Sequence, residues 1–149
     1  MAFEQPSLKG RALRLLSGRE YSRTELERKL QPFEEEPGSL GKALDELQAK
    51  GFISEQRVVE SVLNRRAAKL GVQRIRQELQ AKGLDPQVVS DAVAELRGTE
   101  LVRAQEVWRK KFGQPPEDAA ERARQMRFLA SRGFGGDTIR RVVSGGDDD

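Results

Sequence analysis

The sequence predicts an all-α protein, built as an elongated tandem array of three three-helix repeats that each contain a helix-turn-helix-like pair. The first reason is an internal repeat. "YSRTELERKLQPFEEEPGSLGKALDEL" (21–47) aligns without a gap to "LGVQRIRQELQAKGLDPQVVSDAVAEL" (70–96), which places Leu30 on Leu79. The second reason is the helical spacing of the apolar residues in both copies, with almost no strand signal. Recurrence at a fixed offset is the mark of a tandem array.

The first repeat is expected over residues 1–54 and opens with a helix at about Leu8–Leu16. Ser22 and Glu25 have the S-x-x-E spacing of a capping box, in which the two side chains bond to backbone amides at the start of a helix. They therefore predict a second helix, and a third helix begins after Ser39.

The second repeat is expected over residues 55–98. Ser54 is placed to cap its first helix, over about Glu55–Lys69. Asp85 and Pro86 together predict the start of its third helix, because aspartate caps a helix well and proline fits the first helical position.

The third repeat is expected over residues 99–144, with a first helix at about Glu100–Phe112. The string "RFLASRGFGGDTIRRVV" is a shortened version of the helix pair. Its register is imperfect, because Gln125 falls where the second copy has Ile75. We therefore expect Met126 to take the apolar place.

Repeats of about 50 residues are near the lower size limit for independent folding. We therefore expect each repeat to pack against its neighbour, which gives an elongated row with mostly local contacts. Such a row offers a long surface to a long or repeating partner. Residues 145–149, "GGDDD", are expected to form a disordered acidic tail.

Composition argues against an enzyme. The chain has no cysteine and no histidine, which removes thiol nucleophiles, zinc sites of thiolate or imidazole, and the commonest general base near neutral pH. It contains no glycine-rich phosphate loop and no nucleophile–base–orienter combination. The carboxylates of Glu34–Glu36 lack partners at metal-ligand spacing. No catalytic residue, cofactor or metal is expected.

A cytoplasmic, monomeric protein without a membrane contact is expected. No run approaches the roughly 20 apolar residues that cross a bilayer. The N-terminal "MAFEQPSLKG" lacks the apolar core of a signal peptide.

The candidate contact residues are basic. The net charge is only +3, yet residues 61–77 contain no acid. A positive stripe of this kind suits a phosphate backbone or an acidic protein surface. The alternative is a solvated helical face whose long stems cover apolar surface. The candidates in this segment are Arg65, Arg66, Lys69, Arg74 and Arg76, and the third repeat adds Arg109, Lys110, Lys111 and Arg140.

The helix-turn-helix shape raises the alternative of a free-standing DNA-binding protein. A recognition helix needs Arg, Lys, Asn or Gln side chains aimed at base edges. Residues 86–96 carry Asp91 and Glu95 and no basic residue, and only the last copy, with Arg140 and Arg141, is suited to DNA. Sequence-specific base reading is therefore disfavoured.

The few aromatic residues are assigned to the core rather than to base stacking. Trp108 and Phe112 stand at i, i+4 spacing on a helix whose opposite face is charged. The same assignment is made for Phe52, Phe128 and Phe134.

Several strings resemble the bacterial RecX family of regulatory proteins, in order from about Gly10 to Val143. The strings are "REYSRTELERKL" (19–30), "ALDELQAKGFISEQRVVESVLNRRA" (43–67), "GVQRIRQELQAKGLD" (71–85), "RKKFG" (109–113) and "RFLASRGFGGDTIRRVV" (127–143).

The resemblance implies a modulator of the RecA recombinase that binds along the helical groove of RecA polymerised on single-stranded DNA. Members of the family dampen ATP hydrolysis, strand exchange and filament growth, which affects DNA repair and the SOS response. The implied partner is the RecA filament, with single-stranded DNA bound weakly or through RecA. A helical scaffold for another protein is a further alternative.

Overall fold

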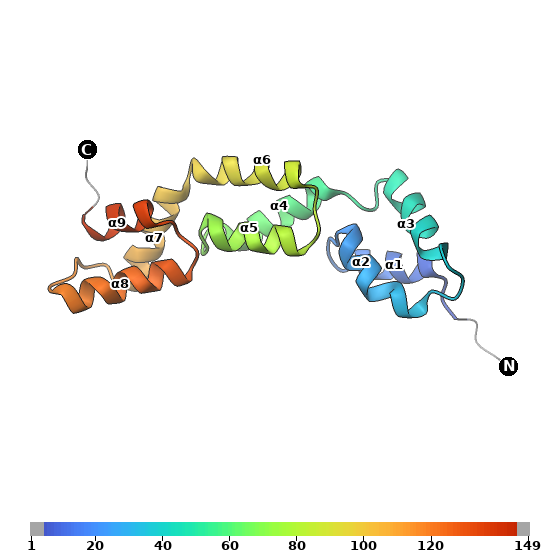
Figure 1. Ribbon diagram of the computed structural model, residues 1–149, viewed down its shortest axis with the longest axis horizontal. Helices are drawn as coiled ribbons and strands as arrows, with labels where there is room; N and C mark the ends of the chain where they lie inside the picture. The colour runs from blue at the N-terminus through green and yellow to red at the C-terminus, as the bar shows by residue number, and fades with distance from the viewer. Residues whose placement is uncertain (1–4, 146–149) are drawn as a thin grey trace.

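The computed structural model describes residues 5–145, and every regular element within them is helical (Figure 1). Apart from Gly145, the predicted acidic tail lies outside the described residues. The elements are α1 (Leu8–Leu16), α2 (Arg23–Leu30), the 3-10 helix η1 (Gln31–Phe33), α3 (Ser39–Ala49), α4 (Glu55–Arg66), α5 (Val72–Ala81), α6 (Pro86–Arg97), α7 (Glu100–Lys111), α8 (Ala119–Ser131) and α9 (Gly136–Val143).

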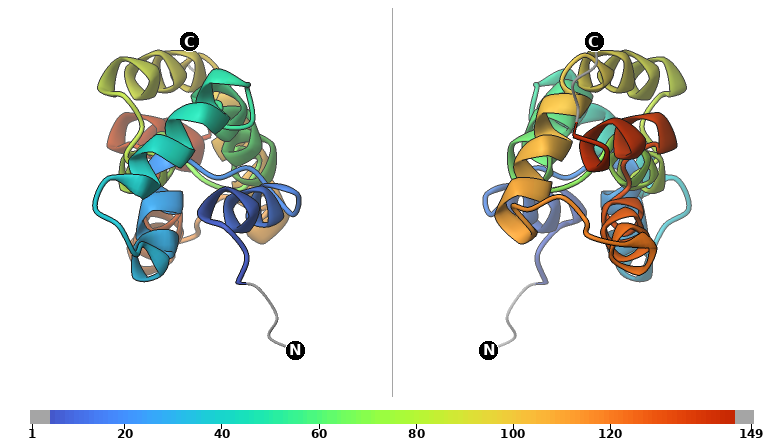
Figure 2. Two further views of the ribbon diagram at one scale, coloured as in Figure 1. Left: turned by 90° about the vertical axis from the view of Figure 1, so that its right-hand side faces the viewer. Right: turned by 90° about the vertical axis from the view of Figure 1, so that its left-hand side faces the viewer.

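The helices form an elongated row of three groups (Figure 1). Module 1 comprises α1–α3 with η1, module 2 comprises α4–α6, and module 3 comprises α7–α9. Modules 1 and 3 lie at opposite ends of the row, and the three modules overlap when the row is viewed end-on (Figure 2). The predicted all-α tandem array is confirmed. The limits 1–54, 55–98 and 99–144 stay predictions.

Each module has an apolar core of its own, built from residues spaced three or four apart. In module 1, Leu26 and Leu30 of α2 lie in one buried cluster with Leu44 and Leu47 of α3. Burying one such side chain contributes roughly 1.5–3 kcal/mol, so these stripes hold the module together. The buried residues of module 2 include Val59, Val62, Ile75, Leu79, Val89, Val93 and Leu96.

The predicted starts of α2, α4 and α6 are present, whereas α3 begins at Ser39 itself rather than after it, with Gly38 as its cap. Ser22 Oγ accepts from the Glu25 amide at 3.1 Å, and the Glu25 carboxylate accepts from the Ser22 amide at 2.9 Å, which completes the capping box. Ser54 caps α4, and Asp85 accepts from the Gln87 amide at 2.8 Å to cap α6. These starts were predictable because a cap is a contact within one short segment.

The core assignment of Phe52 is wrong, because this side chain is 46% exposed while its neighbour Ile53 is buried in the core of module 1. Phe134 is buried as expected, whereas Trp108 and Phe128 are only partly buried against the core of module 3. Two predicted helix ends also differ: α4 ends at Arg66 rather than Lys69, and α7 at Lys111 rather than Phe112. Both differences lie at fraying helix ends.

Gln125, not Met126, occupies the buried position of α8. Gln125 is 1% exposed, and Met126 lies at the edge of the core. Trp108 Nε1 donates to Gln125 Oε1 at 2.8 Å, and Gln125 Nε2 donates to the Gln114 carbonyl at 3.1 Å. A buried amide is tolerated when its polar atoms are bonded, so the position keeps its polar residue.

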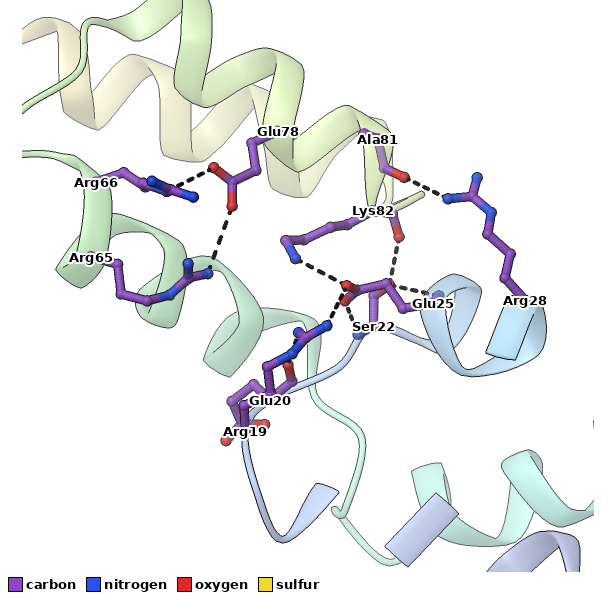
Figure 3. Close-up of polar contacts among 10 residues, drawn as sticks. All are labelled: Arg19, Glu20, Ser22, Glu25, Arg28, Arg65, Arg66, Glu78, Ala81 and Lys82. Carbon is purple, nitrogen blue, oxygen red and sulfur yellow. Dashed lines mark hydrogen bonds and ion pairs between the residues drawn. The ribbon is translucent and has the colours of Figure 1, made fainter. Parts of the chain in front are cut away.

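Modules 1 and 2 meet through polar contacts (Figure 3). Ser22 Oγ donates to the Lys82 carbonyl at 2.6 Å, and Lys82 Nζ donates to Glu25 at 3.1 Å. Arg28 donates to the Ala81 carbonyl at 3.1 Å. The buried apolar clusters of the two modules stay separate. This first joint therefore depends on charge and hydrogen bonds.

Modules 2 and 3 meet backbone to backbone. The Gly71 amide donates to the Arg132 carbonyl at 2.8 Å, and the Gln73 amide donates to the Gly133 carbonyl at 3.0 Å. A Cβ atom on Gly71 would lie 2.5 Å from the carbonyl carbon of Gly133. This second joint therefore requires glycine for the close approach.

Candidate functional site

Arg65 and Arg66 lie together in the last turn of α4, where cations suit the negative end of the helix dipole. Their side chains are 48% and 47% exposed, and they pair with Glu78 of α5 at 3.7 and 3.2 Å (Figure 3). Segment 61–77 is free of acids, but Glu78 follows it directly in α5. The fold places the Glu78 carboxylate beside both arginines. The cluster is therefore less positive than the sequence alone indicates.

Lys69 and Arg76 are the candidates in module 2 whose side chains make neither an ion pair nor a hydrogen bond with another described residue. Lys69 is exposed between α4 and α5. Arg76 lines an open cleft of about 730 Å³ between α5 and α6, together with Arg97, Gln80 and Ser90, and no carboxylate of the described residues lines it. Sequence reasoning missed Arg97.

Arg97 escaped notice because it stands one position beyond the acidic segment 86–96. Its signal was weak, since a single arginine at a helix C-terminus usually serves the dipole. In the structure it is exposed and also lines a smaller neighbouring cleft with Arg76. The two guanidinium groups thus flank the same part of the surface.

Arg74 has a different position from the other candidates. Its guanidinium donates to the Ser131 carbonyl at 2.7 Å, across the second joint. Its stem lies against Gly133, where an added Cβ would be 2.3 Å from the Arg74 Cγ. Arg74 therefore connects modules 2 and 3.

Module 3 carries the second candidate group, at the end of α7. Arg109, Lys110 and Lys111 are all exposed. Arg109 pairs with Glu106 of the same helix. Lys111 Nζ lies 5.3 Å from the centroid of the Phe128 ring, a distance suited to a cation–π contact.

Arg140 is exposed on α9 and pairs with Asp137 of the same helix. Among the nine candidates, the structure brings Arg65 and Arg66 together around one carboxylate. It shows no ion pair or hydrogen bond that joins the module 2 group to the module 3 group within residues 5–145.

Arg103 is a further residue that sequence reasoning missed. It donates to the Ala67 carbonyl at 2.9 Å, the Leu70 carbonyl at 2.7 Å and the Leu96 carbonyl at 3.1 Å. Burial lowers the pKa of this guanidinium, while the nearby Glu100 carboxylate acts in the opposite direction. Arg103 therefore binds the link between α4 and α5. No pattern within a short segment predicts such a long-range contact.

The described part of the chain holds no group of three or more acidic, histidine or cysteine side chains gathered as metal ligands. None of its helices has the length and apolarity to pass through a bilayer. Asp91 and Glu95 are exposed on α6, where a DNA reader needs cations, whereas Arg140 and Arg141 are exposed on α9.

Fold and surface together define a class of protein: a tandem array of helix-turn-helix-like modules with charged side chains along an extended surface. Family models identify it more closely. The model described as the second three-helix domain of RecX matches residues 54–93, and the model of the third three-helix domain matches residues 99–143.

Similar proteins agree with these matches. The chain is 56% identical to "Regulatory protein RecX" of Leptothrix cholodnii over 145 residues, which cover 96% of this chain and 92% of the relative. It is 47% identical to "Regulatory protein RecX" of Chromobacterium violaceum, covering 100% of this chain and 97% of the relative. The chain belongs to the RecX family of regulatory proteins.

Solved structures support the fold. A crystal structure of a regulatory protein RecX matches with a TM-score of 0.75 at 18% identity, covering 92% of this chain and 71% of that one. RecX from Lactobacillus salivarius matches with a TM-score of 0.74 at 20% identity, covering 94% of both chains. The modular array is therefore shared by RecX proteins with very different sequences.

Proposed function

We propose that this chain is a negative modulator of RecA that binds along the groove of the RecA–single-stranded DNA filament. Bound there, it inhibits ATP hydrolysis, strand exchange and filament growth, and so limits DNA repair and the SOS response. The observation that carries the proposal is the 56% identity to a regulatory protein RecX over almost the whole chain.

The elongated row of modules supports a polymeric partner. Each module contacts its neighbours in the row, which leaves a long outer surface open (Figure 1). A row in the groove would exclude an incoming duplex and would couple neighbouring RecA subunits. The chain needs no chemistry of its own for this effect, and we propose that it is not an enzyme.

The proposed contacts are exposed cations, together with the half-buried Arg76, that meet acidic groove surface or nearby DNA. Arg74 supports them indirectly, because its guanidinium holds modules 2 and 3 in their relative positions. The direct contacts we propose are Arg65, Arg66, Lys69, Arg76, Arg109, Lys110, Lys111 and Arg140.

The RecA filament is the main partner in this proposal, and single-stranded DNA is bound weakly or through RecA. We place the protein in the cytoplasm and propose that the free chain is a monomer. The second candidate function is a free-standing DNA-binding protein of tandem helix-turn-helix modules. The exposed Arg140 and Arg141 of α9 favour it, while the acidic surface of α6 opposes it.

A pull-down on RecA–single-stranded DNA filaments, with RecA-free DNA as control, tests the proposal. Retention on filaments with little retention on naked DNA is expected. Equal retention on both, with a steep salt dependence, would support the DNA-binding alternative instead.

A charge-reversal variant then tests the surface. Lys69→Glu combined with Arg76→Glu is expected to weaken inhibition of RecA strand exchange, because both side chains are free of ion pairs within the described residues. Lys42→Glu combined with Lys50→Glu, at exposed positions of module 1, reverses the same number of charges and is the matched control. Equal inhibition by both variants would remove the module 2 surface from the proposal.

A further inference from the structure

The two joints of the array repeat the same contact. Ser22 Oγ donates to the Lys82 carbonyl at 2.6 Å in the first joint, and the Gly71 amide donates to the Arg132 carbonyl at 2.8 Å in the second. Ser22 and Gly71 are equivalent positions of the repeat, as are Lys82 and Arg132. In both joints the start of a second helix meets the turn that follows the second helix of the next module.

Two arginine contacts extend this equivalence. Arg28 donates to the Ala81 carbonyl at 3.1 Å in the first joint, and Arg74 donates to the equivalent Ser131 carbonyl at 2.7 Å in the second. In both joints, an arginine in the first turn of the following module also donates to a backbone carbonyl of the preceding module. Arg57 donates to the Gly51 carbonyl at 2.7 Å, and Arg103 donates to the Leu70 carbonyl at 2.7 Å.

Each module therefore has two different docking surfaces. The head surface is the start of its second helix. The tail surface is the turn after its second helix, together with the first turn of its first helix. Heads meet tails throughout the row, so one tail surface at the module 1 end and one head surface at the module 3 end have no module on them (Figure 1).

The free tail surface of module 1 is partly apolar and has a basic part and an acidic part, the latter formed by Glu35 and Glu36. Phe33 occupies the repeat position of Lys82 and is 46% exposed. The guanidinium of Arg11, in the first turn of α1, lies 3.8 Å from the Phe33 ring centroid. Beside them is an open cleft of about 480 Å³ whose charged lining consists of Arg11, Arg14 and Lys29, with no carboxylate among the described residues.

The free head surface of module 3 is acidic. α8 has 13 residues where α5 has 10, and the additional turn is at its start. Asp118 accepts from the Glu121 amide at 2.8 Å, so this helix opens with the same cap–x–x–Glu spacing as Ser22 and Glu25. Glu117 and Asp118 are exposed beside it. Like the module 1 tail, this end faces outward along the row (Figure 1).

We propose that the free tail surface of one copy receives the acidic start of α8 from a second copy, so that chains align end to end. The contact continues the head-to-tail order of the two internal joints, and the charges of Glu117 and Asp118 are complementary to the cationic cleft of Arg11, Arg14 and Lys29. A heterologous contact of this kind does not close on itself, so it can extend to many copies.

The contact is weak between free chains, because exposed ion pairs contribute little to association. A polymer that holds two copies side by side raises their effective concentration and promotes the contact. This last step rests on the proposed function, with the RecA filament as the polymer. End-to-end contact would make binding along the filament cooperative.

Single-cysteine cross-linking tests the contact, since the natural chain has no cysteine. Pro32→Cys labels the tail surface and Ala120→Cys labels the head surface, and both positions are exposed. A short bismaleimide is added to an equal mixture of the two variants, free and on RecA–single-stranded DNA filaments. We expect a cross-linked heterodimer in several-fold excess over a mixture of Ala120→Cys with Ser90→Cys, whose label is exposed on α6.

Charge reversal makes the test specific. Arg14→Glu in the Pro32→Cys chain is expected to lower the yield several-fold, while Lys42→Glu in the same chain leaves it unchanged. A chain with both cysteines is expected to give a ladder beyond the dimer. A yield at the control level with and without filaments, a yield insensitive to Arg14→Glu, or products that stop at the dimer would overturn the inference.

The pull-down separates this inference from the proposed function. Chains that bind filaments without cross-linking end to end would overturn the inference and leave the function standing. Chains that cross-link in free solution but do not bind filaments would support the end-to-end contact and overturn the function.

Discussion

Lys82 Nζ, directly after α5, lies 3.1 Å from Glu25 Oε2 of α2 and ties module 2 to module 1 (Figure 3). The two side chains are only 12% and 17% exposed, so solvent screens this pair less than an exposed one. Arg19 donates to the same carboxylate oxygen at 3.1 Å. The Glu25 carboxylate thus binds side chains of both modules at the first joint.

The first prediction is that acid loosens the first joint. Burial raises the pKa of Glu25, but bonds from the Ser22 amide, Arg19 and Lys82 outweigh this effect and hold the pKa below its usual 4.5. The carboxylate therefore contributes its full stability above pH 4.5, and the contribution is lost as the pH falls through the lower pKa of the folded protein. Small-angle scattering is expected to show modules 1 and 2 separating in that window.

Glu25→Gln should show the loosened joint already at neutral pH, with little further change on acidification. Glu46→Gln is the matched control, because Glu46 pairs with Lys9 inside module 1 and its pKa is also lowered. The prediction is wrong if the two variants give the same scattering profile at neutral pH.

Much of the fold was predictable because it is encoded within short segments. The capping box of Ser22 and Glu25 and the start at Asp85 involve residues two or three positions apart. The joints were not predictable in this way. Gly83 lies where an added Cβ would be 2.2 Å from Thr24 Oγ1, across 59 positions of sequence, and one sequence carries no signal for such a pairing.

The candidate surface was predictable only as a set of charges. The acid-free segment correctly located Arg65 and Arg66 as exposed cations, but only the fold shows that Glu78 neutralises part of their charge. Arg74 matched the same pattern, and only the fold shows that its guanidinium bonds to the Ser131 carbonyl across the second joint. Charge runs along a sequence do not reveal which cations are already bonded.

The second prediction is that Gly71→Ala disrupts the second joint. The new Cβ would lie 2.5 Å from three backbone atoms of Gly133 and Phe134, which cannot rotate away as a side chain can. The loss is expected at the upper end of the ~1–3 kcal/mol that overpacking costs, measured by urea unfolding. Hydrogen exchange should increase at the Gly71 and Gln73 amides.

Gly51→Ala provides the comparison for that variant. Gly51 has a φ of +84° and nothing within 4 Å of an added Cβ, so this change adds only the ~1–2 kcal/mol of a left-handed backbone. It should leave exchange at the second joint unchanged. Faster exchange at Gln73 in Gly51→Ala would show that the joint responds to general destabilisation.

The third prediction concerns the hydrogen-bonded pair of Trp108 and Gln125. Gln125→Leu leaves the indole N–H and the Gln114 carbonyl without their present partner, so a loss of about 1–3 kcal/mol is expected. Adding Trp108→Phe removes the orphaned indole donor and should recover part of the loss. A double-mutant cycle by urea unfolding measures this coupling, and additive losses would contradict it.

The fourth prediction is that Glu78→Gln strengthens inhibition of RecA. Glu78 now pairs with Arg65 at 3.7 Å and Arg66 at 3.2 Å, and a neutral amide would leave both guanidinium groups free to meet an anionic partner. Because exposed pairs contribute about 0.2–1 kcal/mol, the half-inhibitory concentration in strand exchange should fall by about 1.5- to 5-fold.

Glu60→Gln is the control for this change. Glu60 is exposed on α4 and accepts only from the neutral Gln56 amide among the described residues, so its replacement alters the net charge equally without releasing an arginine. Selective strengthening by Glu78→Gln would locate Arg65 and Arg66 in the contact. Equal strengthening by both variants would indicate long-range attraction by net charge, and no change in either would place the contact elsewhere on the row.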